Sequence, residues 1–408
     1  MFKYDAIVVG GGPAGSSAAI SLAQGGARVL LLEEKRMPRE KLCGEFITPE
    51  CFPSLERLRV MNRMLAAGAQ KISRVSLVVS SGKSVDSQFA AMPSDSTSAM
   101  SLSRARFDQI LFDRAREAGA ECLEGVAVKK CVYENGGPRT IEAMMLQTGK
   151  SATFDASLVI DASGRNSRLT IGRRERVAGR RGSRLYALKA HLKKVESIDN
   201  AVELFFFPQG YGGLARVEDD LINLCFIVDE RTLKVAGGDP SKVLEASVMN
   251  NSVARERLRA AKVVGKWHSA GPLTFGKKRL ASGGVIAIGD ASGMIDPFTG
   301  TGIQIALRTG EIAAQAILEA NQKKSSSAID STKRGSSSSS LDSILTSYER
   351  HYESEFSTRM KISALLRIAA FSPVVAGVLA GVLAHSPGLA SFVFRATRSG
   401  TGGGGAHR

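Results

Sequence analysis

Three glycines near the start of the chain have the spacing of a phosphate-binding turn. Gly10, Gly12 and Gly15 follow residues 6–9, an apolar and β-branched run that is typical of a buried strand. Gly10 permits a tight turn, Gly12 lets the backbone approach a pyrophosphate, and Gly15 lets the next helix pack close to the strand. Glu33 lies where an acceptor for a ribose 2′-hydroxyl is expected, and an acid there favours a free ribose over a 2′-phosphate. The pattern predicts a dinucleotide site.

A strand–helix–strand unit would position these glycines. Residues 16–23 are helical in composition, and residues 29–32 form a second buried strand. Gly25 and Gly26 stop the helix between them. The helix dipole and the free N–H groups at the helix start would hold the phosphates. The alternative is a tight strand-to-helix turn that binds no ligand.

Length and charge limit the class of protein. The chain has 408 residues, which is enough for two domains or for one large domain with another inserted into it. Its net charge is +16 and its pI is about 9.8. No nucleic-acid recognition motif accompanies this charge, and aromatic residues make up only 6%, so nucleic acid is not expected as a partner. An anionic membrane surface or an acidic carrier or substrate fits better, and solvated basic faces are the alternative.

Cysteines and histidines show no metal or disulfide pattern. The five cysteines contain no C-x-x-C pair and their number is odd, so neither a disulfide framework nor a zinc site is expected, and a reducing cytoplasm is the default. The first strand begins within a few residues of Met1, so no signal peptide is expected before it. The histidines have no ligand spacing and are expected to be structural or surface residues: His191, His268, His351, His385 and His407.

Hydrophobic periodicity predicts most of the remaining elements. Expected helices cover residues 53–67, 104–118, 240–261 (with Asp239 as its N-cap) and 303–321. Expected strands cover residues 72–90 (as a hairpin), 121–133, 139–147, 153–160, 186–192, 201–207, 221–228 and 282–290. Turns are expected at residues 135–137 and 208–213, and loops or linkers at residues 34–50, 172–184 and 291–302.

The end of the chain changes in composition. Residues 323–340 are Ser-rich and predict a flexible linker or surface insertion, and a helical segment follows from residue 341. Residues 368–384 carry no charge but include Pro373, so two docked helices, touching a membrane interface or not, are preferred to a bilayer span. The glycine-rich end is expected to be disordered.

Three segments far apart in the sequence combine into a more specific pattern. They are the glycine turn at residues 10–15, Asp-Ala-Ser-Gly at residues 161–164, and Gly-Asp-Ala-Ser-Gly-Met-Ile-Asp-Pro-Phe-Thr-Gly-Thr-Gly at residues 289–302. In this combination residues 1–320 resemble the flavoprotein superfamily of geranylgeranyl reductases and aromatic-ring hydroxylases (group A flavoprotein monooxygenases). The resemblance implies an α/β fold with a Rossmann-type FAD-binding (GR2-like) domain, an inserted antiparallel β-sheet substrate domain and a C-terminal helical segment.

The same resemblance divides the chain into parts. It implies a discontinuous FAD-binding domain and a substrate domain, followed by a linker, C-terminal helices and a disordered tail. The FAD-binding domain would comprise residues 1–71, 98–171 and 270–322, and the substrate domain residues 72–97 and 172–269. The linker would cover residues 323–340, the C-terminal helices residues 341–395 and the disordered tail residues 396–408.

The resemblance also assigns roles around FAD. Asp290 would bond the ribityl or pyrophosphate region, with a simple turn cap as the alternative. The helix that starts near Gly302 would direct its N–H groups at the pyrimidine edge of the flavin. Asp161 would support the pyrophosphate loop or shape its own turn, and Arg104 would face the cofactor or solvent. The full predicted cofactor set is Gly10, Gly12, Pro13, Ala14, Gly15, Glu33, Arg39, Cys43, Gly44, Arg104, Asp161, Gly164, Asp290, Pro297, Gly300, Thr301, Gly302 and Ile303, with no metal ligand.

The loop Pro-Arg-Glu-Lys-Leu-Cys-Gly at residues 38–44 resembles a segment of the reductase branch that lies over the flavin. That branch continues Cys-Gly-Gly, whereas Glu45 follows here, and the Tyr-x-Trp-x-Phe-Pro element of archaeal reductases is missing although Tyr211 is retained. These departures leave the substrate open. Cys43 and Tyr211 are the catalytic candidates. Cys43 is a proton donor, a weak base or an inert thiol, and Tyr211 lines the substrate pocket or only packs.

The expected function is an FAD-dependent oxidoreductase of the geranylgeranyl reductase-like group, acting on an isoprenoid, lipid or polyketide-like substrate. The alternative is a monooxygenase that hydroxylates an aromatic or polyketide-type substrate. A flavin halogenase is a poorer match, because Trp267 is the only tryptophan and a Trp-x-Trp-x-Ile-Pro motif cannot be present. A non-catalytic flavin-binding protein is a further alternative. No second G-x-G-x-x-G occurs, so NAD(P)H would dock transiently or an external donor would supply electrons. The expected location is cytoplasmic or peripheral at the inner membrane face.

Overall fold

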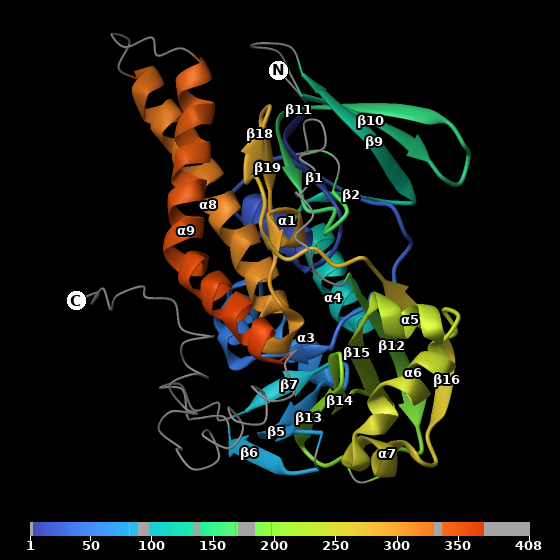
Figure 1. Ribbon diagram of the computed structural model, residues 1–408. Coiled ribbons are helices and arrows are strands. Elements are labelled where there is room, and N and C mark those ends of the chain that lie inside the picture. The colour runs from blue at the N-terminus through green and yellow to red at the C-terminus, as the bar shows by residue number, and fades with distance from the viewer. Residues whose placement is uncertain are drawn as a thin grey trace, which may run out of the picture.

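The computed structural model describes residues 3–80, 82–88, 98–133, 139–167, 169, 184–196, 198–329 and 337–370. Two large sheets, two small sheets and several helices make up this part of the chain (Figure 1). The predicted turn at residues 135–137, the loop at residues 172–183 and the segment after residue 370 lie outside the described residues.

The first large sheet has a parallel centre and contains the predicted strand–helix–strand unit. Its spatial order is β18-β19-β11-β1-β2-β8, and β10 joins β11 to β9 by antiparallel pairing. The strands are β1 (Tyr4–Val9), β2 (Val29–Glu33), β8 (Glu121–Glu124), β9 (Val126–Tyr133), β10 (Arg139–Met145), β11 (Ser151–Asp161), β18 (Ala281–Ser282) and β19 (Val285–Ala287).

Both faces of this sheet are covered, which explains its nearly continuous apolar strands. In β1, Ala6 and Val8 pack against helices, whereas Ile7 and Val9 pack on the β9–β10 side. The helices near the sheet are α1 (Pro13–Gln24), α4 (Arg104–Glu117), α8 (Gly302–Ile329) and α9 (Ser337–Ala370), and the last two lie side by side (Figure 1).

The second large sheet has the spatial order β16-β12-β15-β14-β13-β5-β6. Its neighbours are antiparallel as expected, except that β13 and β5 are parallel. Its strands are β5 (Arg74–Val78), β6 (Ser84–Gln88), β12 (Leu185–Lys193), β13 (Ala201–Phe207), β14 (Gly210–Arg216), β15 (Ile222–Asp229) and β16 (Lys262–Ala270). The short helices α5 (Glu230–Val235), α6 (Pro240–Ala246) and α7 (Ser252–Leu258) lie beside this sheet (Figure 1).

Short elements connect the two large sheets. One small sheet has the order β3-β7-β4, and the other pairs β17 with β20. These strands are β3 (Phe46–Ile47), β4 (Gln70–Ile72), β7 (Ala99–Ser101), β17 (Gly276–Lys277) and β20 (Gly293–Met294). The other short helices are α2 (Phe52–Arg57), α3 (Met61–Ala66), η1 (Pro49–Cys51), η2 (Val248–Asn250), η3 (Gly289–Ala291) and η4 (Pro297–Thr299).

Two helices that periodicity predicted as continuous are broken. Between α2 and α3, Arg59 adopts φ +59°, which turns the chain so that both Leu58 and Val60 are buried. Within residues 240–261, Asn251 starts α7 by accepting bonds from the backbone N–H groups of residues 253 and 254. Its amide also donates to the carbonyl of Phe206, so this side chain is used as a cap rather than as a helix-interior residue.

Other predictions also need correction. Residues 210–213 belong to strand β14 rather than to a turn, because Gly210 and Gly212 let β14 approach β15 closely; a Cβ on Gly210 would lie 2.2 Å from the Ile227 carbonyl oxygen. Strand β16 was not predicted. The expected linker at residues 323–340 is helical at residues 323–329 and 337–340, since Lys, Ala and Ser are all tolerated in helices. Helix α8 therefore extends beyond its predicted end.

No helix in the described part of the chain combines the length and apolar character needed to cross a bilayer. The uncharged stretch at residues 368–384 lies almost entirely outside that part. Contact with a membrane surface therefore stays a prediction.

Helices α1 and α8 touch at Gly310, and this contact yields a stability prediction. A Cβ on Gly310 would lie 2.5 Å from the Ala14 carbonyl oxygen and 2.9 Å from the Ala18 nitrogen. Alanine gains about 1 kcal/mol in helix propensity, but overpacking costs about 1–3 kcal/mol. The clashing atoms belong to the backbone of α1 and cannot rotate aside, so the cost falls in the upper part of this range, and we expect Gly310→Ala to lower the free energy of unfolding by about 1–2 kcal/mol in urea denaturation. The control Gln315→Ala, at an exposed site of the same helix, should stay within about 0.5 kcal/mol. A Gly310→Ala midpoint equal to that of the wild type would contradict the close contact.

Candidate functional site

One cavity of about 700 Å³ extends from the glycine turn to the second large sheet. Most of the residues singled out from the sequence line it. They are Gly10, Gly12, Pro13, Ala14, Glu33, Arg39, Cys43, Gly44, Arg104, Gly164, Tyr211, Asp290, Pro297, Gly300, Gly302 and Ile303. Gly15, Asp161 and Thr301 do not line it; they support it from behind.

The glycine turn leaves backbone exposed to the cavity. Gly10 adopts φ +108°, and a Cβ there would lie 2.4 Å from the Ala162 carbonyl oxygen. A Cβ on Gly15 would lie 1.8 Å from the Gly10 carbonyl oxygen, so α1 is pressed against the turn. At Gly12 the nearest atom to such a Cβ is 3.6 Å away, on Arg39. The start of α1 is therefore open to a ligand, and its N–H groups suit an anion.

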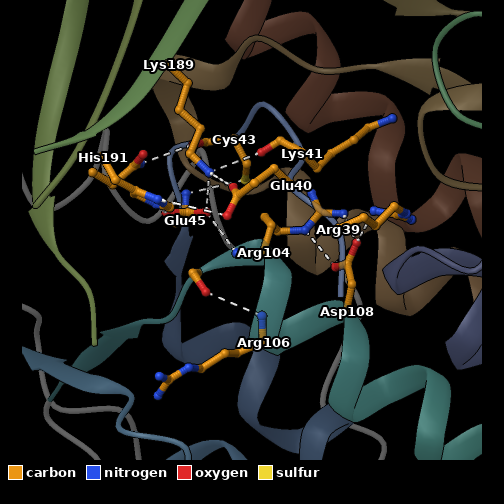
Figure 2. Close-up of polar contacts among 12 residues, drawn as sticks. Arg39, Glu40, Lys41, Cys43, Glu45, Arg104, Arg106, Asp108, Lys189 and His191 are labelled. Carbon is orange, nitrogen blue, oxygen red and sulfur yellow. Dashed lines mark hydrogen bonds and ion pairs between the residues drawn. The ribbon is translucent and has the colours of Figure 1, made fainter. Parts of the chain in front are cut away.

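Two arginines and two acids form a continuous buried network beside this turn. Glu33 Oε2 accepts from the Gly11 N–H at 2.8 Å and from Arg39 Nη2 at 3.1 Å. Arg39 also donates to Asp108 at 2.8 Å, and Asp108 accepts two bonds of 2.7 Å from Arg104 (Figure 2). Burial works against the Arg104 charge, but Asp108 raises the pKa of its guanidinium above the ordinary value. Arg104 is buried, so the alternative in which it faces solvent is wrong.

Asp161 is fully buried and shapes its own turn. Its carboxylate accepts from the Ser163 backbone N–H at 3.1 Å and from the Ser163 hydroxyl at 2.6 Å. The Ser167 hydroxyl donates to its other oxygen. The side chain does not reach the cavity, but the turn it holds does, through Ser163 and Gly164, so support of the pyrophosphate loop stays a prediction.

Asp290 sits in η3 with its side chain facing the cavity. Among the described residues, no hydrogen bond or ion pair is formed by its carboxylate. Burial raises the pKa of this carboxyl group, although Lys41, Arg104 and Lys278 oppose the shift. A half-buried acid that faces the cavity without a protein partner suits the hydroxyl groups of a bound ligand.

Tyr211 fixes the loop that leads into α8. Its hydroxyl donates to Asp296 at 2.5 Å and accepts from the Phe298 N–H at 3.1 Å. Burial and the Asp296 charge raise the pKa of Tyr211 well above its ordinary value, so this phenol stays protonated. Gly300 turns the chain with φ +68°, and a Cβ on Gly302 would meet no atom within 4 Å, which leaves the start of α8 open to the cavity.

The loop at residues 38–44 lies between the two ends of the cavity. Cys43 Sγ accepts from the Glu45 N–H at 3.3 Å, and the Cys43 carbonyl accepts from Asn223 of β15 at 3.1 Å. Beyond this loop the cavity wall is apolar and comes mainly from the second sheet. The apolar residues of this part of the wall include Val75, Leu77, Val85, Val202, Leu204 and Phe206 from the second sheet and Phe298 from η4.

A charged cluster that the sequence analysis missed joins this loop to β12. Glu45 is fully buried and adopts φ +55°. Its carboxylate accepts from Lys189 Nζ at 2.5 Å and from the Arg104 backbone N–H at 2.8 Å, and it contacts His191 Nε2 at 2.7 Å (Figure 2). Lys189 also donates to Glu40 at 2.8 Å. Of the two roles expected for His191, the surface role is wrong, since its side chain is only 11% exposed.

Charges within the cluster compensate for burial. Burial opposes ionisation of Glu45, but His191 and Lys189 hold the pKa of its carboxyl group below the ordinary value. Burial also opposes the Lys189 charge, and Glu45 and Glu40 raise the pKa of that ammonium. The sequence signal that could have revealed this cluster is the spacing of Lys189 and His191. They lie two residues apart on an otherwise apolar strand and therefore on the same face of it.

Together, a dinucleotide-binding sheet and a cavity shared with a second sheet define a cofactor-dependent oxidoreductase. The family model described as "FAD binding domain" matches residues 3–335, and the chain belongs to this family. It is an FAD-dependent enzyme, and the expected α/β fold and FAD cofactor are confirmed.

Several known proteins are similar to the chain. A 1H-pyrrole-2-carbonyl-(peptidyl-carrier protein) chlorinase of Pseudomonas fluorescens is 24% identical over 345 residues, covering 78% of this chain and 76% of that protein. Digeranylgeranylglycerophospholipid reductase 2 of Methanopyrus kandleri is 27% identical over 377 residues, covering 88% and 84%. The structure of a flavin-dependent brominase has a TM-score of 0.76 at 21% identity, covering 97% and 93%. Halogenases and reductases thus share this scaffold.

Asp290 yields a prediction about stability and pH. Because its folded-state pKa is raised, the ionised side chain destabilises the protein without cofactor above that pKa. We expect Asp290→Asn without FAD to be more stable than the wild type at neutral pH, and the difference to shrink as pH falls and the acid protonates. Urea denaturation at several pH values measures this. The control Asp220→Asn changes a side chain that is 93% exposed and should stay within about 0.5 kcal/mol at every pH. A less stable Asp290→Asn would mean that the carboxylate has a protein partner.

Proposed function

We propose that the protein is a reductase of the geranylgeranyl reductase-like group that transfers reducing equivalents from FAD to a hydrophobic substrate. The observation that carries this proposal is the continuous cavity, which joins a phosphate-binding turn to an apolar sheet face. Cys43 and Glu40 line this cavity, so polar groups able to hold a proton would border the place where cofactor and substrate meet.

FAD would lie along the first sheet, with its phosphates at the start of α1. Gly12 leaves room there, and Arg39 and Arg104 lie close enough to balance phosphate charge. Glu33 keeps one oxygen beside the Lys35 N–H and can accept from the ribose. Asp290 would accept from a cofactor hydroxyl, and the start of α8 at Gly302 would stabilise charge on the reduced ring. FAD supplies the electron chemistry, and these residues bind and orient it.

The substrate would occupy the apolar end of the cavity. Its walls favour a hydrocarbon chain or ring, as in the expected isoprenoid, lipid or polyketide-like class. Tyr211 serves as a wall, because its hydroxyl is held at the loop before α8 by Asp296 and by the Phe298 N–H. Cys43 is the remaining candidate for direct proton donation. NAD(P)H docking transiently, or an external donor, would supply the electrons.

Oxygen-dependent chemistry is the second candidate function. It is favoured by the likeness to a chlorinase whose name specifies a substrate attached to a peptidyl-carrier protein. The net charge of +16 would suit an acidic carrier. Halogenation or hydroxylation would use the same FAD contacts, so the choice between the candidates depends on what reacts at the apolar end.

One experiment separates these candidates. Purified protein with FAD is mixed with NAD(P)H and geranylgeranyl diphosphate. The reaction is run with and without oxygen, and with and without chloride or bromide. Mass spectrometry identifies the products. A gain of hydrogen without oxygen is expected. A strict need for oxygen would overturn the reductase proposal, and a further need for halide would establish halogenation. Turnover with a carrier-attached aromatic acid but not with the free isoprenoid would favour the second candidate.

The same site predicts a loss of FAD affinity. A hydrogen bond to a charged group contributes about 1.5–3 kcal/mol, so Asp290→Asn should bind FAD roughly tenfold more weakly or worse. Fluorescence titration of the protein without cofactor measures this. Glu203→Gln is a matched control, because Glu203 is buried in the second sheet but does not line the cavity. Unchanged affinity in Asp290→Asn would remove this residue from the cofactor site.

A further inference from the structure

We propose that Cys43 and Cys225 form a dithiol site that hydrogen peroxide oxidises to a disulfide, which ties the loop at residues 38–44 to strand β15. Both cysteines are free and half-buried, and both line the cavity, so a small oxidant inside the cavity can reach either sulfur. The inference rests on the proposed function only for its consequence, because an oxidised Cys43 has no proton to give.

Contacts on both sides of Cys43 hold the loop over the strand pair that carries Cys225. Cys225 is paired directly with Lys189 in the antiparallel ladder of β15 and β12, so the two side chains lie on the same face of the sheet. Lys189 Nζ donates to the Lys41 carbonyl at 3.3 Å and to the Glu45 carboxylate at 2.5 Å (Figure 2). The loop is therefore fixed, before and after Cys43, to the residue opposite Cys225.

A third contact comes from β15 itself. Asn223 Nδ2 donates to the Cys43 carbonyl at 3.1 Å. Asn223 and Cys225 are two residues apart on one strand, so their side chains point to the same face. Together the three contacts place Cys225 beside the part of the loop that carries Cys43.

The surroundings of the two sulfurs give them different roles. Cys43 Sγ accepts from the Glu45 N–H at 3.3 Å, and Arg104 forms a side-chain hydrogen bond with it. A guanidinium and a backbone N–H stabilise a thiolate, which is the form of cysteine that attacks peroxide. Burial, with a further contribution from Cys43, raises the pKa of Cys225 to about 12 and keeps it a thiol. Cys43 is therefore oxidised first, and Cys225 then reacts with it.

The other three cysteines lack this setting. Cys51, Cys122 and Cys131 do not line the cavity. Burial raises the pKa of Cys122 and of Cys131 to about 11, and Cys51 is only 1% exposed. Peroxide in the cavity therefore meets Cys43 and Cys225 before these thiols.

Oxidation takes two electrons from the two sulfurs. The Cys43 thiolate attacks one oxygen of hydrogen peroxide, the O–O bond breaks, and a sulfenic acid forms while hydroxide leaves and takes up the proton that Cys43 gave up. The Cys225 sulfur then attacks the Cys43 sulfur and the S–S bond forms. The S–O bond breaks, and its OH leaves as water with the Cys225 proton. Two thiols and one peroxide thus become one disulfide and two molecules of water.

Peptide mapping tests this without any substrate. Protein with bound FAD and reduced thiols is treated with a small excess of hydrogen peroxide. The remaining thiols are blocked with iodoacetamide, and tryptic peptides are analysed without reductant. Trypsin places Cys43 in residues 42–57 and Cys225 in residues 217–231. We expect these peptides to be joined with the loss of two hydrogen atoms, the protein to lose two of its five thiols, and dithiothreitol to reverse both changes.

Variants assign the two sulfurs. Cys43→Ser should leave Cys225 reduced at the same dose of peroxide, and Cys225→Ser should stop at a Cys43 sulfenic acid that dimedone labels. Cys51→Ser is the matched control, because Cys51 lies in the same tryptic peptide as Cys43 but not at the cavity, and it should keep the cross-link. Wild-type protein in which these two peptides are not joined would overturn the proposal, as would a cross-link that survives in Cys43→Ser.

Turnover separates the dithiol site from the function on which its consequence rests. In the reductase assay, activity should fall in proportion to the cross-linked fraction and return with dithiothreitol. A cross-link in protein that shows no reductase activity in either state would overturn the proposed function and leave the dithiol site in place. Reductase activity in protein that forms no cross-link would overturn the dithiol site alone. Absorbance of bound FAD shows that each variant is folded.

Discussion

The buried ion pair between Glu45 and Lys189 is the contact on which the shape of the cavity depends. Glu45 belongs to the loop that leaves the first sheet, whereas Lys189 belongs to β12 of the second sheet. Burying both charges is costly, and removing one partner of such a pair costs about 3–5 kcal/mol because the other charge is left unpaired. The pair therefore fixes the loop with Cys43 against the second sheet far more specifically than apolar packing would.

A second connection lies at the other side of the cavity. Tyr211 of β14 holds Asp296 and the Phe298 N–H, so the second sheet also fixes the loop that begins α8. The two connections have different physical characters, since one is an ion pair and the other a neutral donor on a carboxylate. Between them the cavity floor is set by glycines, because Gly10 and Gly15 allow contacts that no side chain could make. Shape at the cofactor end therefore comes from backbone, and shape at the substrate end comes from side chains.

Local sequence patterns could predict the first of these parts but not the second. The unit β1–α1–β2, the glycine turn and the start of α8 depend on residues close together in the chain, and all were predicted. Lys189 and Glu45 are 144 residues apart, so their contact exists only after both sheets have formed. Strand β14 was missed for a related reason. Its glycines suggest a turn locally, but β15 needs them to be small. Asp161 shows the converse, because its motif left two roles open and its contacts with Ser163 and Ser167 shape a turn that either role would need.

The same division explains how one scaffold can serve both reductases and halogenases. Cofactor binding requires the backbone geometry of the turn, where Gly10 and Gly15 tolerate no side chain, and an α8 start that Gly302 leaves open. The chemistry that follows depends on which groups border the apolar end, and a few substitutions on β12 or on the loop at residues 38–45 can change those groups without disturbing the turn. In this chain the loop places the Cys43 thiol and the Glu40 carboxylate at the cavity wall, whereas Lys189 and His191 do not line it. A thiol and a carboxylate can hold and deliver a proton, and a proton is what hydride transfer to a carbon–carbon double bond requires in addition to the electron pair. The proton-holding groups at the cavity wall, more than overall likeness, are therefore the physical argument for reduction.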